Sequence, residues 1–341
     1  MKAALMSEYH RPLELVERPD PEPIGARDVV VRIAGAGVCA TDLHSIDGLM
    51  EPAGVRLPLV LGHENGGWVH AVGEGVTAAA VGDPVLLYPP YSCGLCVPCR
   101  RALDMHCERH GFTGLTRDGG FAEYVLVDER SVVPLPDGVD PAVAAPIADA
   151  GITAYHAVKR LVPLLDPGST TAVIGVGGVG HLALQLLRIL GAGEVVAIDP
   201  KEGCRKLARE LGAKEVLGAE DDPADAVREL TNGRGADVVL DCVGTDETHS
   251  VGLRSLAPRG LFSIVGYGGT VSVPSVQLIA TETAIAGNLV GSWIDLWEVL
   301  QLYARGVLKL KAETHPLEDV NEVLDALRKG DITGRAVLVP S

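Results

Sequence analysis

The distribution of apolar and polar residues changes along the chain. Residues 1–149 carry short runs in which the two kinds alternate, such as 28–33 and 121–127, with Gly, Pro and other turn residues between them. Alternation of this kind predicts short, half-buried strands, and therefore a compact β-rich domain. Residues 141–165 are rich in Ala and Leu and predict helix.

Strand-like and helix-like patterns alternate from residue 170 to residue 290. This order is typical of βαβ units, so we expect an α/β fold with a doubly wound parallel sheet beside the β-rich domain. The expected strands are 170–174, 194–198, 236–241, 261–265 and 285–290, and the expected helices include 202–212 and 223–231. Two further helical patterns, 295–305 and 319–329, and a last strand at 336–339 are too little for a separate domain.

A glycine motif lies between the first two strands of the second region. Its residues are Gly175, Gly177, Gly178, Val179 and Gly180, and the strand that follows ends on Asp199. In G-x-G-x-x-G the first glycine permits a tight turn, the second lets a pyrophosphate approach, and the third lets helix and strand pack closely. Asp199 would bind the adenosine ribose hydroxyls and repel a 2′-phosphate, which favours NAD over NADP. A purely structural glycine turn is the alternative, but the complete strand–helix–strand unit favours a dinucleotide site.

The length and net charge of the chain bear on its number of domains and on the partners it can bind. A chain of 341 residues is typical of two domains, and a net charge of −16 argues against nucleic acid or anionic membranes as partners. The N-terminus lacks the apolar run of a signal peptide, and no stretch approaches the length of a membrane span. We therefore expect a cytoplasmic protein, in which seven cysteines indicate metal binding or catalysis rather than disulfides.

Four of these cysteines are closely spaced as C-x2-C-x2-C-x7-C. They are Cys93, Cys96, Cys99 and Cys107. Four thiolates can surround one ion tetrahedrally, which is typical of zinc or an iron centre. Because such a set leaves no coordination position open, we expect a structural site.

A second group of candidate residues is scattered along the chain. Its members are Cys39, Thr41, Asp42 and His44, then His63 and Glu64, and finally Asp149. Asp149 lies in an apolar segment, where a charge is costly unless it is paired or bound to metal. Taken separately, a small buried cysteine, a turn histidine and a capping aspartate are ordinary features. The residues alone leave both interpretations open.

In their order and approximate spacing, these motifs resemble the zinc-dependent alcohol dehydrogenases of the medium-chain dehydrogenase/reductase superfamily. The likeness covers essentially the whole chain, and the segment Asp149 to Thr153 is similar to the bacterial branch that acts on secondary alcohols. It implies that Cys39, His63 and Asp149 bind a catalytic zinc, with Glu64 as an alternate ligand. The four-cysteine set then holds a second zinc.

The resemblance also implies a domain organisation. Residues 1–150 would form a GroES-like catalytic domain, residues 151–290 an NAD-binding Rossmann domain, and residues 291–341 would return to the catalytic domain. The active site would lie in the cleft between the two. Relatives are homodimers or homotetramers.

Roles for individual residues follow from the same resemblance. Asp42 would orient His63, while Thr41 and His44 would relay the proton of the alcohol to solvent. Further contacts to NAD are implied for Thr153, Val265, Leu289, Gly291 and Arg335. The expected activity is hydride transfer between NAD and an alcohol or its ketone, with a secondary alcohol as the preferred substrate.

Two residues depart from the family pattern. Cys204 occupies a position that usually carries a basic residue near the ribose, for which Lys201 or Arg205 could substitute. Asn65 stands where glycine is common.

The alternative functions are a polyol or aromatic-alcohol dehydrogenase, a zinc-lacking reductase on the same fold, and a non-catalytic dinucleotide sensor. The metal-type residues argue against the reductase, and Thr41 with His44 argues against the sensor.

Overall fold

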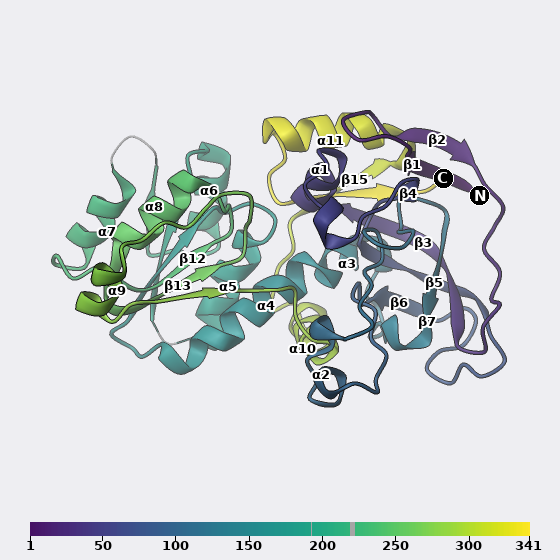
Figure 1. Ribbon diagram of the computed structural model, residues 1–341, viewed down its shortest axis with the longest axis horizontal. Coiled ribbons are helices and arrows are strands. Elements are labelled where there is room, and N and C mark those ends of the chain that lie inside the picture. Colours follow the sequence, from purple (N-terminus) through teal and green to yellow (C-terminus); the bar gives the residue numbers. More distant parts are fainter. Residues whose placement is uncertain (192, 219–221) are drawn as a thin grey trace. The chain divides into compact units, whose positions relative to one another are not determined.

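The computed structural model describes residues 1–191, 193–218 and 222–341, which form two compact units (Figure 1). One unit comprises Met1–Ile152, Ser292–Gly306 and Leu310–Ser341, and the other comprises Thr153–Gly291 and Val307–Lys309. No helix in the described part of the chain has the length and apolar character that a membrane crossing needs.

The second unit is built on a six-stranded sheet in which every pairing is parallel. Its order is β11-β10-β9-β12-β13-β14. The strands are β9 (Thr170–Ile174), β10 (Glu194–Ile198), β11 (Glu215–Leu217), β12 (Ala236–Asp241), β13 (Leu256–Ile264) and β14 (Ala284–Gly287). The strand order reverses between β9 and β12, which makes this the topological switch point of the sheet.

Helices precede and connect these strands. Helix α4 (Ala150–Leu161) precedes β9, and the connecting helices are α5 (Gly180–Leu190), α6 (Glu202–Glu210), α7 (Pro223–Leu230), α8 (Asp246–Ser255) and α9 (Ser275–Thr281). Helix α5 packs beside α6, and α7 packs beside α8. Because the chain runs in opposite directions from the switch point, right-handed crossovers place these two pairs on opposite faces of the sheet. The expected doubly wound α/β fold is confirmed.

The first unit is β-rich, and its larger sheet has seven strands. The order is β15-β16-β3-β5-β6-β8, with β7 paired to β3. These strands are β3 (Asp28–Val38), β5 (Glu64–Val72), β6 (Pro84–Leu87), β7 (Tyr124–Asp128), β8 (Val132–Pro134), β15 (Ala312–Pro316) and β16 (Arg335–Val339). A small sheet, β2-β1-β4, consists of β1 (Lys2–Met6), β2 (Glu14–Glu17) and β4 (Leu59–Val60).

Helical segments separate these strands along the chain. They are α1 (Ala40–Ile46), α2 (Val97–Arg100), α3 (Pro141–Ala144), the 3-10 turn η4 (Ala145–Ala148), α10 (Trp293–Ala304) and α11 (Val320–Lys329). The C-terminal segment returns to this unit because β16 pairs antiparallel with β3, Ala336 opposite Val38. The core combines apolar residues of β3, β5 and β6 with residues of α11.

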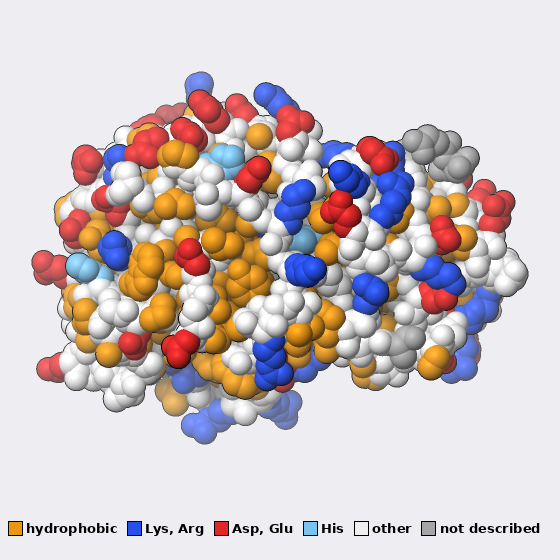
Figure 2. Space-filling model, turned by 180° about the vertical axis from the view of Figure 1, so that it is seen from behind, with side chains coloured by type: hydrophobic (Ala, Val, Ile, Leu, Met, Phe, Trp, Pro, Cys, Tyr) orange, Lys and Arg blue, Asp and Glu red, His pale blue; other side chains and the backbone are white. Residues whose placement is uncertain are grey.

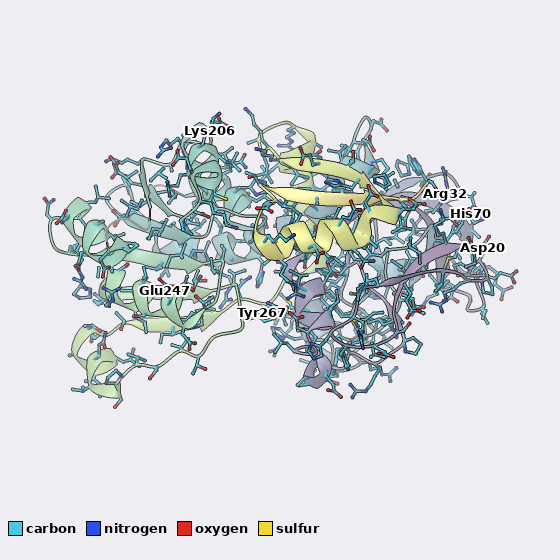
Figure 3. All side chains as sticks on the ribbon, turned by 90° about the horizontal axis from the view of Figure 1, so that it is seen from above. Asp20, Arg32, His70, Lys206, Glu247 and Tyr267 are labelled. Atoms are coloured by element: carbon cyan, nitrogen blue, oxygen red, sulfur yellow. The ribbon has the colours of Figure 1, made fainter. Side chains whose placement is uncertain are left out.

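Apolar and charged side chains share the surface. Figure 2 shows apolar side chains gathered into patches between basic and acidic ones on the face that it draws. On the outer side of the large sheet, Arg32 of β3 and His70 of β5 lie close together (Figure 3). The guanidinium carbon of Arg32 lies 4.9 Å from the centre of the Trp68 ring, and the ring of His70 is tilted by 55° against that of Tyr124, with centroids 4.8 Å apart.

Candidate active site

Three segments of the first unit bring four metal-type side chains together. Cys39 lies between β3 and α1, Glu64 begins β5, and Asp149 follows η4. Gly37 of β3 pairs with Glu64, and a Cβ at Gly37 would lie 2.0 Å from Oε2 of that side chain. The glycine therefore leaves room for the carboxylate between the strands. Ligand atoms of Cys39, His63, Glu64 and Asp149 all lie within 4.8 Å of one another.

Burial and donor chemistry show that this set fits a metal ion. All four residues are buried, and Oε2 of Glu64 has no hydrogen-bond partner among the described residues. Nε2 of His63 lies 3.5 Å from Oδ2 of Asp149. Ligands around a tetrahedral zinc lie about 3.3–3.8 Å apart, given bonds of about 2.0–2.3 Å. A sulfur, an imidazole and carboxylates at this spacing match the donors that zinc prefers.

The electrostatics of the metal-free residues favour the protonation state of the thiol that a metal needs. Burial alone would raise the pKa of the Cys39 thiol, but the positive charges of Arg335 and His63 outweigh it and lower that pKa. Burial would lower the pKa of His63, whereas Asp42 and Asp149 raise it well above its ordinary value. The carboxylates of Asp42 and Asp149 therefore favour a positive charge at the point where an ion would bind. The lowered pKa of Cys39 favours the thiolate, which is the form of cysteine that binds metal.

Asp42 holds two of the proposed ligands in place. Its Oδ1 lies 3.4 Å from Nδ1 of His63, and its Oδ2 accepts a hydrogen bond of 2.9 Å from the backbone of Cys39. The carboxylate is fully buried. It therefore fixes the ring of His63, leaving Nε2 facing Asp149.

Helix α1 carries the two residues expected in the proton relay. Oγ1 of Thr41 lies 3.8 Å from Sγ of Cys39, beside the donor set. His44 lies three residues further, one turn along the helix, and is half-buried. Burial lowers the pKa of its imidazole. A ring that is neutral at physiological pH can accept a proton.

Arg335 contacts the donor set directly. Its Nη2 lies 2.9 Å from Oε1 of Glu64 and 3.7 Å from Sγ of Cys39, and the residue is buried. The pairing of β16 with β3 places it there. Sequence analysis assigned Arg335 only to the pyrophosphate, and nothing in the spacing of the motifs linked it to Glu64. The pyrophosphate contact stays a prediction.

Asn65, which the sequence left unexplained, stabilises the turn that carries His63. Its Nδ2 donates to the carbonyl of Gly62 at 3.0 Å, and Gly62 has a φ of +94°. A Cβ at Gly120 would lie 1.8 Å from Oδ1 of Asn65. The asparagine therefore occupies space that glycine at position 120 leaves free.

The four clustered cysteines form a second donor set. Sγ of Cys96 lies 3.3 Å from Sγ of Cys99 and 3.9 Å from Sγ of Cys107. Backbone amides donate to the sulfurs of Cys93 and Cys107, at 3.3–3.5 Å. Such bonds favour thiolates, and backbone hydrogen bonds from Leu95 and Cys96 lower the pKa of Cys93 to about 6. The set fits a closed, four-coordinate zinc.

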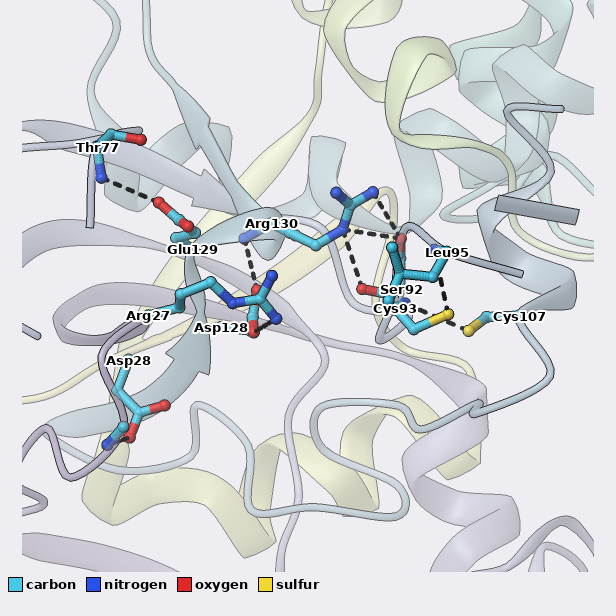
Figure 4. A network of polar contacts seen from close by, with 11 residues as sticks. Arg27, Asp28, Thr77, Ser92, Cys93, Leu95, Cys107, Asp128, Glu129 and Arg130 are labelled. Atoms are coloured by element: carbon cyan, nitrogen blue, oxygen red, sulfur yellow. Dashed lines mark hydrogen bonds and ion pairs between the residues drawn. The ribbon is translucent and has the colours of Figure 1, made fainter. Parts of the chain in front are cut away.

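A polar network connects this cysteine set to the large sheet (Figure 4). Nε of Arg130 donates to the carbonyl of Ser92 at 3.0 Å, and its Nη2 donates to Oγ of Ser92 at 3.2 Å. Oγ of Ser92 donates to Asp104 at 2.9 Å and lies 3.7 Å from Sγ of Cys99. A Cβ at Gly94 would lie 2.4 Å from Nη1 of Arg130. The guanidinium thus covers the loop between the first two cysteines.

In the second unit, the glycine motif has the geometry that its pattern predicts. Gly175 has a φ of +84°, and a Cβ at Gly180 would lie 1.8 Å from the carbonyl of Gly175. A Cβ at Gly177 would meet nothing within 4 Å. The first glycine therefore makes the turn, the third permits close packing, and the second faces open space. Val179 precedes α5, and the positive dipole end at the N-terminus of that helix favours a bound phosphate.

Asp199 has a contact that sequence analysis did not predict. Its Oδ2 accepts a hydrogen bond from the backbone amide of Val176 at 2.8 Å, and its Oδ1 accepts one from the backbone amide of Lys201 at 2.9 Å. The carboxylate therefore holds the glycine turn. Arg205 donates to the carbonyls of Asp199 and Pro200, at 3.2 and 2.7 Å, while Cys204 is buried. Arg205 is thus a basic group beside the aspartate.

The other expected NAD contacts lie at the carboxyl ends of neighbouring strands. Val265 follows β13, and its amide donates to the carbonyl of Asp241 at 2.9 Å. Leu289 and Gly291 follow β14, and Nδ2 of Asn288 donates to the carbonyl of Thr153 at 3.4 Å. Because carboxyl ends of parallel strands meet at one edge, these residues share the edge that carries the glycine turn.

Comparison with known proteins gives the family. A model described as "Alcohol dehydrogenase GroES-like domain" matches residues 25–137, and one described as "Zinc-binding dehydrogenase" matches residues 178–305. An alcohol dehydrogenase of Geobacillus stearothermophilus is 38% identical, with 99% of each chain covered. The chain belongs to the zinc-dependent alcohol dehydrogenases.

Two further relatives support the assignment. An NAD-dependent alcohol dehydrogenase of Sulfurisphaera tokodaii is 33% identical, with 100% of each chain covered. The crystal structure of the alcohol dehydrogenase from Aeropyrum pernix is 44% identical, has a TM-score of 0.97, and is matched over 100% of each chain. The resemblance drawn from the sequence is confirmed, as are the enzyme class and the GroES-like character of the β-rich part of this alcohol dehydrogenase.

Proposed function

We propose that this alcohol dehydrogenase interconverts a secondary alcohol and its ketone, with zinc at Cys39, His63 and Asp149 and with NAD as the hydride acceptor. The observation that supports the proposal most directly is the buried convergence of sulfur, imidazole and carboxylate donors beside Thr41. Family membership supports alcohol oxidation with zinc and NAD. The choice of a secondary alcohol goes beyond what family membership supports.

Zinc, when bound, supplies a Lewis acid that makes the hydroxyl of the alcohol more acidic. The chain itself would move the proton. Thr41, next to the donor set, accepts it through its hydroxyl, and His44, one turn further on α1, passes it to solvent. NAD held at the glycine motif would supply the acceptor for a hydride from the carbon of the alcohol, so that one proton and one hydride would leave the substrate.

The residues next to the donor set favour an apolar substrate. The ring of Phe112 lies edge-on to that of His63, with centroids 6.0 Å apart, and Leu115 is buried nearby in sequence. A polyol would require several hydrogen-bonding side chains to replace the water it loses on binding. Polyol or aromatic-alcohol oxidation therefore remains the second candidate.

A coenzyme-coupled absorbance screen tests the proposal. Matched pairs such as 2-butanol and 1-butanol, cyclohexanol and benzyl alcohol, and a sugar alcohol are compared with NAD and with NADP. We expect the highest kcat/KM with NAD and a secondary alcohol, and loss of turnover after chelation that zinc restores. A higher kcat/KM for the sugar alcohol or for benzyl alcohol would select the second candidate.

The same proposal includes self-association in the cytoplasm. Strand β14 is an edge strand, and the adjacent helix α9 exposes Val276 and Ile279 to 70% and 76%. An unpaired strand edge with apolar neighbours is suited to a second copy of the chain. Seven free cysteines, four of them set for metal, are consistent with a reducing compartment. Sedimentation of the wild type and of Ile279→Asp tests the interface, and we expect the variant to dissociate.

A further inference from the structure

Helices α1 and α11 are joined by a bidentate ion pair near the expected proton relay. Nη1 of Arg328 lies 2.8 Å from Oδ2 of Asp47, and its Nη2 lies 2.9 Å from Oδ1. Asp47 is the residue at which α1 ends, and Arg328 is in the last turn of α11. Both oxygens of the carboxylate are therefore engaged by one guanidinium, the strongest geometry for such a pair.

His44 lies three residues before Asp47 on the same helix. Side chains at this spacing are neighbours on a helix surface, so a carboxylate at position 47 is within reach of a protonated imidazole at position 44. The C-terminal end of a helix also favours a positive charge, which would act in the same direction. An aspartate with no other partner would thus hold a proton on His44.

We propose that Arg328 withdraws Asp47 from His44, so that the imidazole stays neutral and releases protons readily to solvent. This inference rests on the proposed role of His44 as the relay to solvent. Arg328 is then a positioning residue, because it acts on the relay through Asp47 and touches neither the metal donors nor the glycine motif.

The charges around this cluster agree in direction with the geometry. Burial lowers the pKa of His44, the charge of Asp47 raises it, and that of Arg328 lowers it again. The hydrogen bonds from Arg328 lower the pKa of Asp47, with His10 and His44 adding to the effect. Asp325, on α11, acts on Arg328 in turn. Removing Arg328 takes away a positive charge that lowers the pKa of His44. It also leaves Asp47 without its partner, so that the negative charge of Asp47 raises that pKa more strongly.

Substitutions of Arg328 and of Asp47 should therefore shift the pKa of His44 in opposite directions. In Arg328→Met the pKa of His44 should rise, so the acidic limb of kcat/KM against pH moves up by roughly 0.15–0.4 pH unit, the size expected for neighbouring charges on a helix. In Asp47→Asn the remaining cation should lower that pKa, and the limb moves down. The double variant should return close to the wild type. A merely structural tie between the helices would lower stability in both variants and leave the profile in place.

The experiment uses the zinc- and NAD-loaded enzyme, with the His44 ring followed by NMR in parallel and assigned by its loss in His44→Gln. Arg254→Met is the matched control, because Arg254 forms a similarly exposed pair with Asp222 at 2.7 Å in the other unit. Unchanged titration of the His44 ring in both Arg328→Met and Asp47→Asn would overturn the inference. If Arg328→Met does not fold, Arg328→Lys, which keeps the charge and loses the bidentate geometry, and Asp47→Asn still decide it. If His44→Gln leaves the pH profile unchanged, the relay fails, while the ring titration still tests the ion pair.

Discussion

Arg335 and Glu64 form a buried ion pair beside the residues that we expect to bind zinc, with Nη2 2.9 Å from Oε1. Burial raises the pKa of the Glu64 carboxyl, and the guanidinium, which stays charged, opposes this. A carboxylate that can exchange between an arginine and a metal needs such a counterion when it is not a ligand. If Glu64 is the alternate zinc ligand that the family resemblance implies, this pair would be the position that its carboxylate occupies when it does not bind metal.

Removing one partner of this pair should be costly. Arg335→Leu leaves the carboxyl of Glu64 buried without a cation, and we expect the free energy of unfolding to fall by about 3 kcal/mol. Calorimetry of the variant measures the loss. The double variant Arg335→Leu/Glu64→Leu should recover most of it, because no unpaired charge remains. Equal stability of the single variant and the wild type would show that the pair contributes nothing.

The sequence predicted local chemistry more completely than long-range contacts. The spacing of Cys93 to Cys107 lies within one loop, so four ligands could be inferred from the residues alone. The link from Cys39 to His63 and Asp149 needed the family resemblance, because it depends on the pairing of β3 with β5 and on η4 packing against β5. No spacing rule encodes those contacts.

For the helices and strands too, local patterns were predicted better than contacts between distant parts of the chain. The strongly apolar strands β9, β10 and β12 have the bounds that their patterns predicted. The short strand β11 was not predicted because three residues carry no periodicity. Strand β13 begins at Leu256, earlier than the expected 261, and this start was missed because Pro258 and Gly260 interrupt the apolar pattern. The pairs Arg335–Glu64 and Arg328–Asp47 were not predicted either, since each joins residues far apart in the chain.

Loss of Asp149 should remove one zinc and leave the other. In Asp149→Ala the first donor set keeps the thiol of Cys39, the imidazole of His63 and the carboxylate of Glu64, which is paired with Arg335, while the cysteine set is untouched. We expect metal analysis to give one zinc per chain instead of two, no alcohol turnover, and unchanged binding of NADH by fluorescence. Cys96→Ser is the complementary variant and should lose the other zinc. Two zinc ions retained in Asp149→Ala would reject this residue as a ligand.

The contacts of Asp199 separate its electrostatic role from its structural one. Asp199→Asn keeps an oxygen for the amide of Val176 but loses the negative charge, so it should weaken discrimination against NADP while stability changes little. Asp199→Gly should also release the glycine turn, and its melting temperature should fall as well. The ratio of kcat/KM for NAD and NADP, measured with thermal unfolding, distinguishes the two effects. An unchanged coenzyme ratio in both variants would reject the charge as the discriminating feature.

Arg130 should control how firmly the cysteine set holds its metal. Its guanidinium positions Ser92, which in turn lies against Cys99 and Asp104, and outer contacts of this kind change metal affinity by about 10–100-fold. In the Asp149→Ala background, which isolates the cysteine set, Arg130→Met should release zinc to a chelator at least about tenfold faster. Arg27→Met is the matched control, because Arg27 binds Asp128 in the same network at 2.8 Å without touching the cysteine loop (Figure 4). If both variants release zinc at the same rate, the network only ties loops together, and the role of Arg130 in metal retention is wrong.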